Sequence, residues 1–375
     1  MTQSIQKVLI IGGGFSGMSA AILLQRQGLD VTVLEIDKNW RTDGAGITIS
    51  GPSLRAIEKI GLLDEFKEHG AITINVDMCT AEGNFIKQIA TPPVPHSSVV
   101  GGGGIMRPVL AKLLAKHTRA AGVNVILGHT FSAIDESNDK VSVTMTNGVT
   151  EDYDIVVAAD GLCSKVRETI FPEAPQPQYT GQGVWRAVVP RFDLERASLF
   201  FGPSGKMGFT PVSETEMYLN YTELRPNKDR IAKEDELDYL LNLLRCFTAP
   251  ITEKVKATLN PQSQILYRPL EGMILPRPWY KGRILLIGDA VHATTPHLAS
   301  GAGMGLEDAV VLSEELTTGG HFNAIFERFQ NRRWERCRMI VANSLRLGEI
   351  EMSGGAKEEH VQIMALSMAS LLAPF

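Results

Sequence analysis

The sequence predicts an α/β protein in which a doubly wound domain is interleaved with a domain built on an antiparallel sheet and followed by a C-terminal helix. A strand, glycine-turn and helix pattern opens the chain, residues 180–224 alternate strand-like runs with turn residues, and the first pattern resumes near residue 283. The 375 residues are also about two and a half times the ~150-residue unit of domain size. Two domains are therefore expected, and the chain returns to the first of them after leaving it.

The composition is that of a globular protein and excludes several other classes. Apolar residues make up 44% of the chain and charged residues 21%, and the net charge of −5 offers no basic field for nucleic acid. No run approaches the ~18 apolar residues of a membrane span, and the apolar run before Gly12 is too short for a signal peptide. We expect a cytoplasmic protein, monomer or homodimer, without a nucleic-acid partner. The cysteines lie far apart, which predicts free thiols and no metal site: Cys79, Cys163, Cys246 and Cys337.

The elements of the first domain follow in chain order. Apolar runs predict strands, of the buried parallel type at Lys7–Ile11 and buried also at Arg283–Ile287, and apolar residues spaced by three and four predict helices. The expected strands are Lys7–Ile11, Val31–Glu35, Val123–Leu127, Val141–Thr146, Ile155–Ala159 and Arg283–Ile287, and the expected helices are Ser16–Gln27, 53–69, 107–121, 302–316 and 323–351. The run Gly101–Gly104 is predicted only as a flexible loop ahead of Arg107.

The second domain occupies the middle of the chain. Gly183–Val189 and Met217–Tyr221 are strand-like runs typical of an antiparallel sheet, and 233–247 and 249–256 are predicted to be helical. These patterns place the first domain in 1–75, 100–175 and 275–345, the second domain in 76–99 and 176–274, and a helical tail in 346–375. The end of the tail, Val361–Phe375, is predicted to pack on the body or on a second subunit rather than on a membrane.

The first motif with chemical meaning is a G-x-G-x-x-G turn between a strand and a helix. Gly12 permits the tight turn, Gly14 lets the backbone approach a pyrophosphate, and Gly17 lets the helix pack on the strand. Glu35 closes the next strand, where its carboxylate can accept hydrogen bonds from ribose hydroxyls. An acidic residue at this position fits NAD or FAD and opposes a 2′-phosphate.

Two further motifs follow buried strands. Asp289 comes directly after the strand Arg283–Ile287 and can bind a polyol, although an Asp in this position also serves as a simple turn or helix cap. The glycine-rich loop after it, which contains Gly301 and Gly303, can present backbone N–H groups and a helix N-terminus to a flat anionic ligand. Asp160 begins the third motif, which taken alone favours a capped turn and a basic helix face.

Together these three motifs resemble those of the class A flavin monooxygenases, the aromatic hydroxylases built like p-hydroxybenzoate hydroxylase. That family carries G-x-G-x-x-G, then D-G-x-x-S-x-x-R, then G-D-A-x-H-x-x-x-P, and all three are present at comparable spacing. The sequence around Thr294–His297 is most similar to that of salicylate and 6-hydroxynicotinate hydroxylases. The resemblance covers nearly the whole chain and implies a Rossmann-like FAD-binding domain interleaved with a substrate-binding sheet.

The resemblance also implies which residues contact the cofactor, FAD. It adds Arg41, Gly46, Arg107, Asp160 and Asp289 to the glycine turn, and it places Gly301, Ala302 and Gly303 at the flavin. Without it, Arg41 is a surface charge and Arg107 a helix-start arginine. Many relatives have Gln where this chain has Ser300, so a role of that Gln side chain does not transfer.

The sequence indicates the residues that contact the substrate less specifically than those that contact FAD. The resemblance places Tyr218 of the sheet and Thr48 near the substrate, and Pro296 on the face of the flavin where oxygen reacts. Period-2 alternation puts Asn220 on the same face as Tyr218 and Tyr221 on the other, although the Tyr218 ring could equally pack against the sheet. Two weaker candidates are Lys206, which could hold an acidic substituent or be solvated in a turn, and His297, which could face the substrate.

The resemblance implies a hydroxylase that activates O₂ as a flavin C4a-hydroperoxide after reduction of FAD by transient NADH or NADPH. Its substrate would be a small activated aromatic ring of the phenol, hydroxybenzoate or hydroxypyridine type. Three alternatives remain: a flavin monooxygenase that modifies or inactivates a polycyclic antibiotic or other secondary metabolite, an NAD-dependent dehydrogenase without flavin, and a non-catalytic flavin-binding protein.

Overall fold

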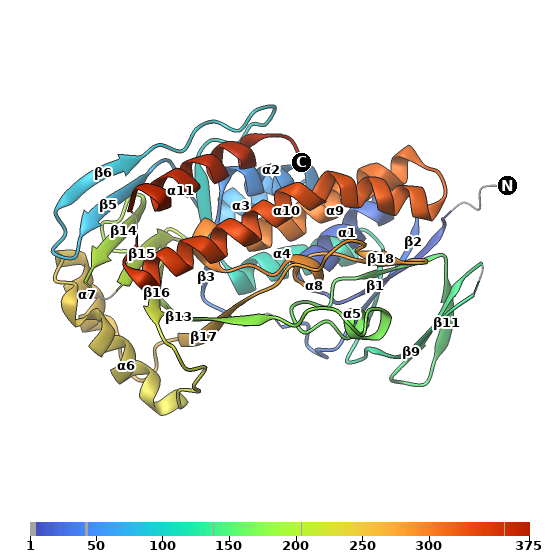
Figure 1. Cartoon of the computed structure of the whole chain (residues 1–375), viewed down its shortest axis with the longest axis horizontal. Helices are drawn as coiled ribbons and strands as arrows, with labels where there is room; N and C mark the ends of the chain where they lie inside the picture. Colours follow the sequence, from blue (N-terminus) through green and yellow to red (C-terminus); the bar gives the residue numbers. More distant parts are fainter. Residues whose placement is uncertain (1–4, 42–43, 138, 204, 356) are drawn as a thin grey trace.

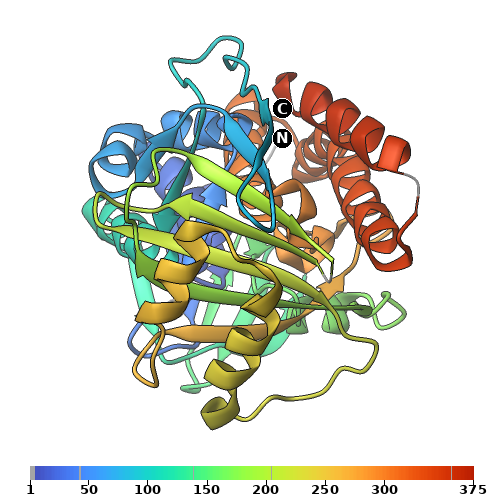
Figure 2. The ribbon, with the colours of Figure 1, turned by 90° about the vertical axis from the view of Figure 1, so that its left-hand side faces the viewer.

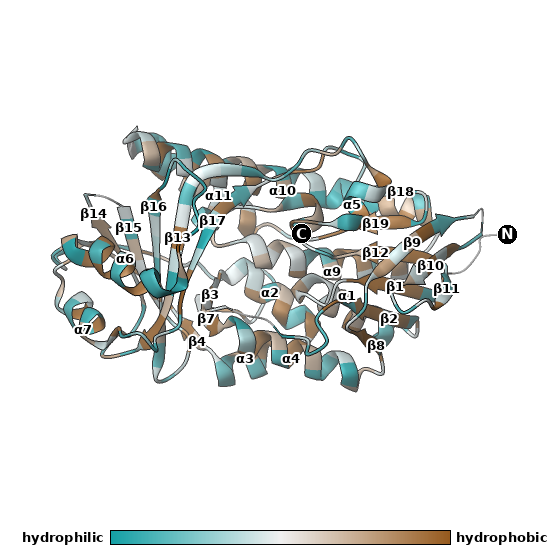
Figure 3. Ribbon diagram, turned by 90° about the horizontal axis from the view of Figure 1, so that it is seen from below, coloured by the Kyte–Doolittle hydropathy of each residue, from teal (hydrophilic) through white to brown (hydrophobic). Residues whose placement is uncertain are grey.

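The computed structural model describes residues 5–41, 44–137, 139–203, 205–355 and 357–375 (Figure 1). Its first domain is built on a six-stranded sheet of order β18-β19-β12-β1-β2-β8, parallel except at β18. The strands are β1 (Lys7–Ile11), β2 (Asp30–Glu35), β8 (Asn124–Leu127), β12 (Ile155–Ala158), β18 (Tyr280–Lys281) and β19 (Ile284–Leu286). The central strands are buried on both faces, as their apolar colour in Figure 3 reflects.

Helices and a small sheet enclose this domain. A three-stranded sheet lies at the end of the domain near the N-terminus (Figure 1) and comprises β9 (Phe131–Glu136), β10 (Val141–Met145) and β11 (Thr150–Tyr153). The helices are α1 (Phe15–Arg26), α2 (Gly51–Ile60), α3 (Leu63–His69), α4 (Arg107–Ala120), α5 (Lys165–Ile170), α8 (Asp289–His292), α9 (Gly301–Thr318) and α10 (Phe322–Ser353). Helix α9 packs on α1, α2 and α10, so it lies at the centre of the helical layer.

The second domain is a seven-stranded sheet of order β17-β13-β16-β15-β14-β5-β6, mostly antiparallel. Its strands are β5 (Val76–Thr80), β6 (Phe85–Ile89), β13 (Gln178–Pro190), β14 (Ala197–Gly202), β15 (Gly205–Pro211), β16 (Glu216–Leu224) and β17 (Ile265–Gly272). Helices α6 (Glu236–Leu243) and α7 (Pro250–Thr258) cover its outer face (Figure 2). Trp185 and Tyr221 are fully buried in the core between the sheet and these helices. The predicted fold class is confirmed.

The two domains meet at a small sheet of β3 (Gly46–Ile49), β7 (Gly102–Met106) and β4 (Ala71–Thr73). The prediction of a flexible loop for Gly101–Gly104 is wrong, because β7 is the central strand of this sheet. A side chain at Gly104 would overlap the carbonyl oxygen of Pro211 in β15, and one at Gly103 would lie 2.8 Å from the Phe66 ring. The glycines therefore let the two domains pack backbone against backbone.

Two predicted helices are shorter than expected. The helix predicted for 53–69 is divided into α2 and α3, because Gly61 adopts a left-handed conformation (φ 83°) that ends α2. The helix predicted for 233–247 contains α6 between two single 3₁₀ turns, Lys233–Asp235 and Leu244–Cys246.

The C-terminal segment packs on its own chain. Helix α11 (Lys357–Leu372) lies beside α10, and the Phe375 ring contacts the Arg55 guanidinium at 4.8 Å (Figure 1). The boundary that we place at residue 346 falls inside α10, which continues to Ser353. Among the described residues, no helix combines the length and apolarity needed to cross a membrane.

Candidate active site

The turn between β1 and α1 is tightly packed on one side and open on the other. Gly12 has φ +106°, and a side chain there would overlap the Ala159 carbonyl oxygen, while one at Gly17 would overlap the Gly12 carbonyl oxygen. Around Gly14, by contrast, no described atom lies within 4 Å of the position a Cβ would take. Helix α1 also begins there without a side-chain cap, so its first N–H groups face the open side and are available to an anion.

Glu35 ends β2 beside this turn. Its Oε2 accepts a hydrogen bond from the Gly13 N–H at 2.7 Å, and its Oε1 accepts one from the Asp37 N–H at 2.7 Å. These bonds fix the carboxylate at the turn, and each oxygen retains a lone pair for a further donor. Arg41 lies apart from this group, since its exposed side chain pairs with Asp37 at 3.4 Å and makes no contact described with the other predicted residues.

Asp289 lies in a hollow of the protein surface. It follows β19 as the first residue of α8, and its side chain is reachable by solvent. Nevertheless burial raises its pKa above the usual range, with the charges of His292 and Arg107 opposing the shift. A side chain that is exposed and yet surrounded by protein lies in a concave part of the surface.

Asp160 lies at the end of the neighbouring strand β12. Its Oδ2 accepts a hydrogen bond from the Val166 N–H at 3.1 Å, and Ser164 caps α5 through the Arg167 N–H, as the capped-turn interpretation predicts. Its Oδ1, however, is buried and has no hydrogen-bond partner within the described part of the chain. Burial raises the pKa of this carboxyl, and the unpartnered oxygen is suited to a ligand donor.

Arg107 links the hollow to the sheet of the second domain. Burial lowers the pKa of its guanidinium, and the neighbouring charge of Arg186 lowers it further, while Asp289 and Tyr218 oppose the shift. Charges that interact in this way lie close together. The Arg107 N–H also donates to the Ala45 carbonyl oxygen at 3.0 Å, and the Tyr218 side chain packs over the next residue, Gly46. Asp289 of the first domain and Tyr218 of the second therefore border the same region around Arg107.

The glycine-rich loop leads into α9, but its glycines serve packing as well. A side chain at Gly303 would overlap the Ser53 hydroxyl of α2, whereas Gly301 and Ala302 are partly accessible at the first turn of α9. Pro296 is exposed and begins a 3₁₀ turn, Pro296–Leu298, that precedes α9. Ser300 is buried, and its hydroxyl donates to the Leu298 carbonyl at 2.8 Å, which fixes the loop just before the helix.

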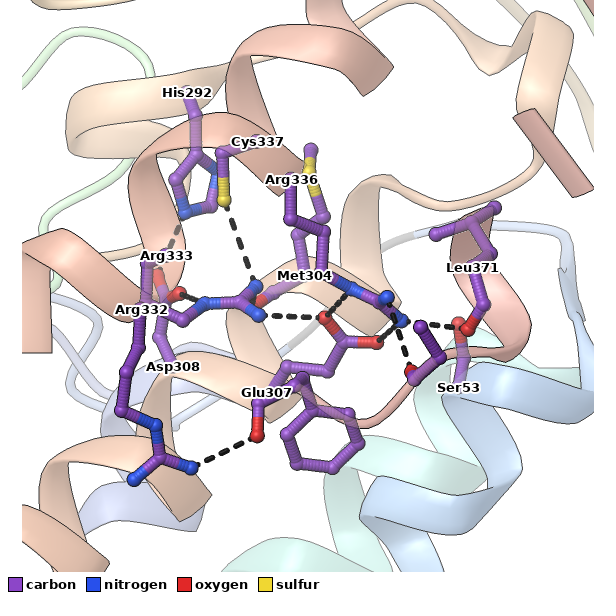
Figure 4. Close-up of polar contacts among 12 residues, drawn as sticks. Ser53, His292, Met304, Glu307, Asp308, Arg332, Arg333, Arg336, Cys337 and Leu371 are labelled. Atoms are coloured by element: carbon purple, nitrogen blue, oxygen red, sulfur yellow. Dashed lines mark hydrogen bonds and ion pairs between the residues drawn. The ribbon is translucent and has the colours of Figure 1, made fainter. Parts of the chain in front are cut away.

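A buried ionic network holds α9 in place (Figure 4). The Arg333 guanidinium of α10 donates to Asp308 Oδ1 at 2.7 Å and to Glu307 Oε2 at 2.8 Å, and Arg336 forms two further hydrogen bonds to Glu307. Asp308 Oδ2 in turn accepts from the Gly288 N–H and contacts His292 Nε2 at 2.7 Å. This network ties α9 to the turn that carries Asp289.

The positively and negatively charged side chains of this network stabilise one another. Although burial disfavours the charged form, Cys337 and Asp308 raise the pKa of His292 well above its usual value. His292, Asp308 and Cys337 also bring three possible metal ligands within 4.8 Å of one another. The Arg333 guanidinium, 3.5 Å from Cys337 Sγ, already supplies the cation at that position, so we do not assign a metal site there.

On the second domain, one face of the sheet presents the substrate-side residues. Arg186 Nε donates to the Tyr218 hydroxyl at 3.0 Å, and Arg186 pairs in register with Asn220 on β16. The Tyr218 ring packs directly over Gly46, where a side chain would overlap it. Thr48 Oγ1 lies 3.2 Å from Thr210 Oγ1, which brings the small sheet to the same face. The predicted alternation is confirmed, because Tyr221 points to the helices on the other face.

Lys206 and His297 form a different group. Lys206 is not solvated as its turn suggested: its Nζ pairs with Glu351 Oε1 of α10 at 2.7 Å. The His297 Nε2 lies 3.4 Å from Glu351 Oε2, and His360 contacts the same carboxylate. Although burial alone would raise it, the pKa of Glu351 is strongly lowered by His297, His360 and Lys206. The structure thus brings Lys206 and His297 to each other through Glu351, rather than to Tyr218.

Arg186 is the site residue that the sequence reasoning missed. It lies within the apolar run Gly183–Val189, where a charged side chain is costly unless it has a partner or a function. The sequence signal was therefore an isolated arginine in an otherwise apolar strand; only the register with β16 shows that it shares a face with Tyr218.

Comparison with known proteins identifies the family. Residues 6–343 match the FAD binding domain family. The chain is 29% identical over 349 residues to 2-heptyl-3-hydroxy-4(1H)-quinolone synthase of Pseudomonas aeruginosa, covering 92% of this chain and 89% of that protein. It is 27% identical over 370 residues to 3-hydroxybenzoate 6-hydroxylase of Polaromonas naphthalenivorans, covering 93% and 89%. The structure of Klebsiella pneumoniae HpxO with FAD and uric acid superposes with a TM-score of 0.82 at 23% identity, covering 98% of this chain and 92% of that one.

The chain belongs to the FAD binding domain family and is an FAD-dependent monooxygenase, and aromatic hydroxylases are among its relatives. The resemblance inferred from the three motifs is confirmed. The flavin-free dehydrogenase interpretation is set aside, because the family match spans both the first glycine turn and the Asp160 and Asp289 motifs.

Proposed function

We propose that this family member hydroxylates an activated, small aromatic or heteroaromatic ring, with NADH or NADPH as the transient reductant of its FAD. The observation that carries the proposal is a set of contacts at the junction of the two domains. Arg186 donates to the Tyr218 hydroxyl, and the Tyr218 side chain packs over Gly46, next to the Ala45 carbonyl oxygen that accepts from the Arg107 N–H. The charges of Arg107 and Asp289 interact there. The proposed cofactor-binding residues of the first domain and the tyrosine-bearing sheet of the second domain meet there. Reduced FAD supplies the activation of O₂, and the protein supplies position and charge.

The open turn and the hollow fit an extended dinucleotide. We assign the pyrophosphate to Gly12, Gly14 and Gly17, where the uncapped α1 presents free N–H groups. Glu35 is placed for the adenosine ribose and Asp289 for the ribityl hydroxyls, with Arg107 beside it. The first turn of α9, at Gly301 and Ala302, directs the positive end of the helix dipole toward the flavin ring. Arg41 and Asp160 are secondary candidates for contacts with the cofactor.

Tyr218 and Arg186 are proposed to orient and activate the substrate. Because Arg186 donates to the Tyr218 oxygen, the tyrosine proton is free to point into the site toward a substrate oxygen. The guanidinium charge also favours negative charge that develops on that oxygen as the ring becomes electron-rich. Thr48 and Asn220 border the same face and are placed to contact ring substituents.

Tyr218→Phe should reduce substrate-dependent hydroxylation by roughly 10²-fold, since it removes a proton-transfer group without removing the ring. Flavin content should be unchanged. The control is Tyr221→Phe, on the opposite face of the same strand, where the ring packs edge-on against Phe247. Product formation per NAD(P)H consumed is the measurement, and equal losses in both variants would argue against a role for Tyr218 in the reaction.

A secondary-metabolite substrate is the second candidate. It is supported by the similarity to the quinolone synthase, whose name describes a hydroxylated heteroaromatic ring with an alkyl chain. A panel of 3-hydroxybenzoate, hydroxypyridines, urate and 2-heptyl-4-quinolone separates the two candidates. Each compound is tested for stimulated NAD(P)H oxidation and for a product heavier by one oxygen. Oxidation that yields only hydrogen peroxide with every compound would leave the hydroxylase proposal unsupported.

A further inference from the structure

The turn between β1 and α1 contains one glycine that its backbone conformation does not explain. Gly13 is buried and its φ is not positive, so other residues could adopt the same backbone. Space excludes them, because a Cβ at Gly13 would lie 2.5 Å from Trp40 Nε1 and 3.1 Å from Glu35 Oε2. Gly14, the next residue, is exposed, and no described atom lies within 4 Å of a Cβ placed there. The turn therefore has a closed side, formed by Trp40 and Glu35, and an open side at Gly14.

The Trp40 side chain is held on the closed side by several contacts. Its Nε1–H donates a hydrogen bond to the Gly13 carbonyl oxygen at 2.8 Å. The indole packs against the apolar core to which α4 contributes, and the Arg119 guanidinium of α4 lies 4.6 Å from the centroid of the indole. The backbone of Trp40 has φ 49°, a left-handed conformation that is rare for a bulky residue, and its N–H donates to the Asp37 carbonyl oxygen at 3.0 Å. Contacts with α4 and with the loop after β2 thus hold the indole against the glycine turn.

The hydrogen bond from Trp40 determines the direction of the next peptide N–H. In a planar trans peptide the carbonyl oxygen and the N–H point in opposite directions. Because the Gly13 carbonyl points to Trp40 on the closed side, the N–H of Gly14 points away from Trp40, toward the open side. The Gly13 N–H is held as well, since it donates to Glu35 Oε2 at 2.7 Å. A rotation of this peptide would break the Trp40 bond and turn a carbonyl oxygen toward the open side.

We propose that Trp40 is a positioning residue for the cofactor: its indole N–H fixes the Gly13 carbonyl so that the Gly14 N–H is presented to the diphosphate of FAD. An N–H donor attracts a phosphate oxygen, whereas a carbonyl oxygen in the same place would repel it. This role of Trp40 rests on the proposed placement of the diphosphate at the turn. It also accounts for the glycine at position 13, because any side chain there would displace the indole.

The first test replaces Trp40 by 3-benzothienylalanine, which keeps a bicyclic ring of similar size and has sulfur in place of the N–H. FAD affinity, measured by titrating flavin-free protein with FAD, should fall about 3- to 10-fold, the value of one hydrogen bond. The ³¹P signals of the bound diphosphate should also shift, which a merely structural role of the indole would not cause. The control is the same replacement at Trp334 of α10, whose ring lies 5.4 Å from the Arg277 guanidinium. Unchanged FAD affinity or unchanged ³¹P signals in the Trp40 protein would overturn the proposal.

A second test uses the crowding at Gly13. Gly13→Ala should weaken FAD binding roughly 10-fold or more, because its Cβ would collide with Trp40 Nε1. In a Trp40→Phe background the smaller ring leaves the Nε1 position empty, so the further loss caused by Gly13→Ala should be smaller. Equal losses in the two backgrounds would show that the indole does not set the shape of the turn, which contradicts the proposal.

Gly14→Val separates the role of Trp40 from the placement of the diphosphate. The φ of Gly14 is −75° and its surroundings are open, so the protein accommodates the valine side chain, which fills the space assigned to the diphosphate. FAD binding should therefore be strongly weakened. Unaltered FAD binding in Gly14→Val would refute both the placement and the role of Trp40. Weakened binding in Gly14→Val, together with unaltered binding in the Trp40 protein, would refute the role of Trp40 alone.

Discussion

Asp289→Ala should yield protein that is purified largely without flavin and is inactive until excess FAD is added. The carboxylate lines the hollow next to Arg107, and its removal takes away the acceptor that we assign to the ribityl hydroxyls. A charge-assisted hydrogen bond contributes about 1.5–3 kcal/mol, so a loss of roughly 10- to 100-fold in FAD affinity is expected. The ratio of flavin to protein absorbance and a titration with FAD measure it.

Two further variants make this result specific. Asp289→Asn keeps an acceptor oxygen and should retain more FAD than the alanine variant. Asp193→Ala changes an exposed aspartate of the second domain, whose side chain is 96% exposed, and should bind FAD as the unaltered protein does. Full flavin occupancy and activity in Asp289→Ala would show that the hollow does not hold the ribityl chain.

Arg333→Met should destabilise the fold by about 3–5 kcal/mol, because it removes the cation that bridges two buried carboxylates. The fully buried guanidinium bonds to both Asp308 and Glu307, and these acids hold α9 beneath the proposed flavin site. The measurement is urea unfolding of the flavin-free and FAD-loaded protein. We also expect weaker FAD binding in this variant, since the position of α9 depends on the network.

Arg338→Met is the matched control on the same helix. Arg338 pairs with Glu335 in an exposed i,i+3 ion pair, which contributes at most about 1 kcal/mol. If the two variants unfolded at the same urea concentration, the buried network would not be the element that fixes α9.

The sequence predicted a feature correctly where only one residue type meets the physical requirement of the position. The glycine turn lies between β1 and α1, Glu35 ends β2 and Asp289 follows β19, as predicted. At Gly12 and Gly17, a positive φ or a close approach of the backbone leaves little choice of residue. Periodicity also predicted that Tyr218 and Tyr221 face opposite sides of the sheet.

The remaining features depend on contacts between distant segments. Gly101–Gly104 carries no local signal that a strand of another domain will pack against it, so the strand β7 was missed. Lys206 and His297 are brought together by Glu351, which lies beyond residue 345, where the motifs give no guidance. The Arg186–Tyr218 bond joins two strands, and neither strand alone reveals it.

The most direct test of the central claim, that this flavoprotein inserts oxygen into an aromatic ring, is isotope incorporation under ¹⁸O₂. FAD-loaded protein, NADH or NADPH and the most stimulating compound of the panel are incubated, and the product is analysed by mass spectrometry. We predict a product with one ¹⁸O atom on the ring and, in Tyr218→Phe, a marked fall in that product with flavin retained. A product without ¹⁸O, or one that takes its oxygen from water, would contradict the claim.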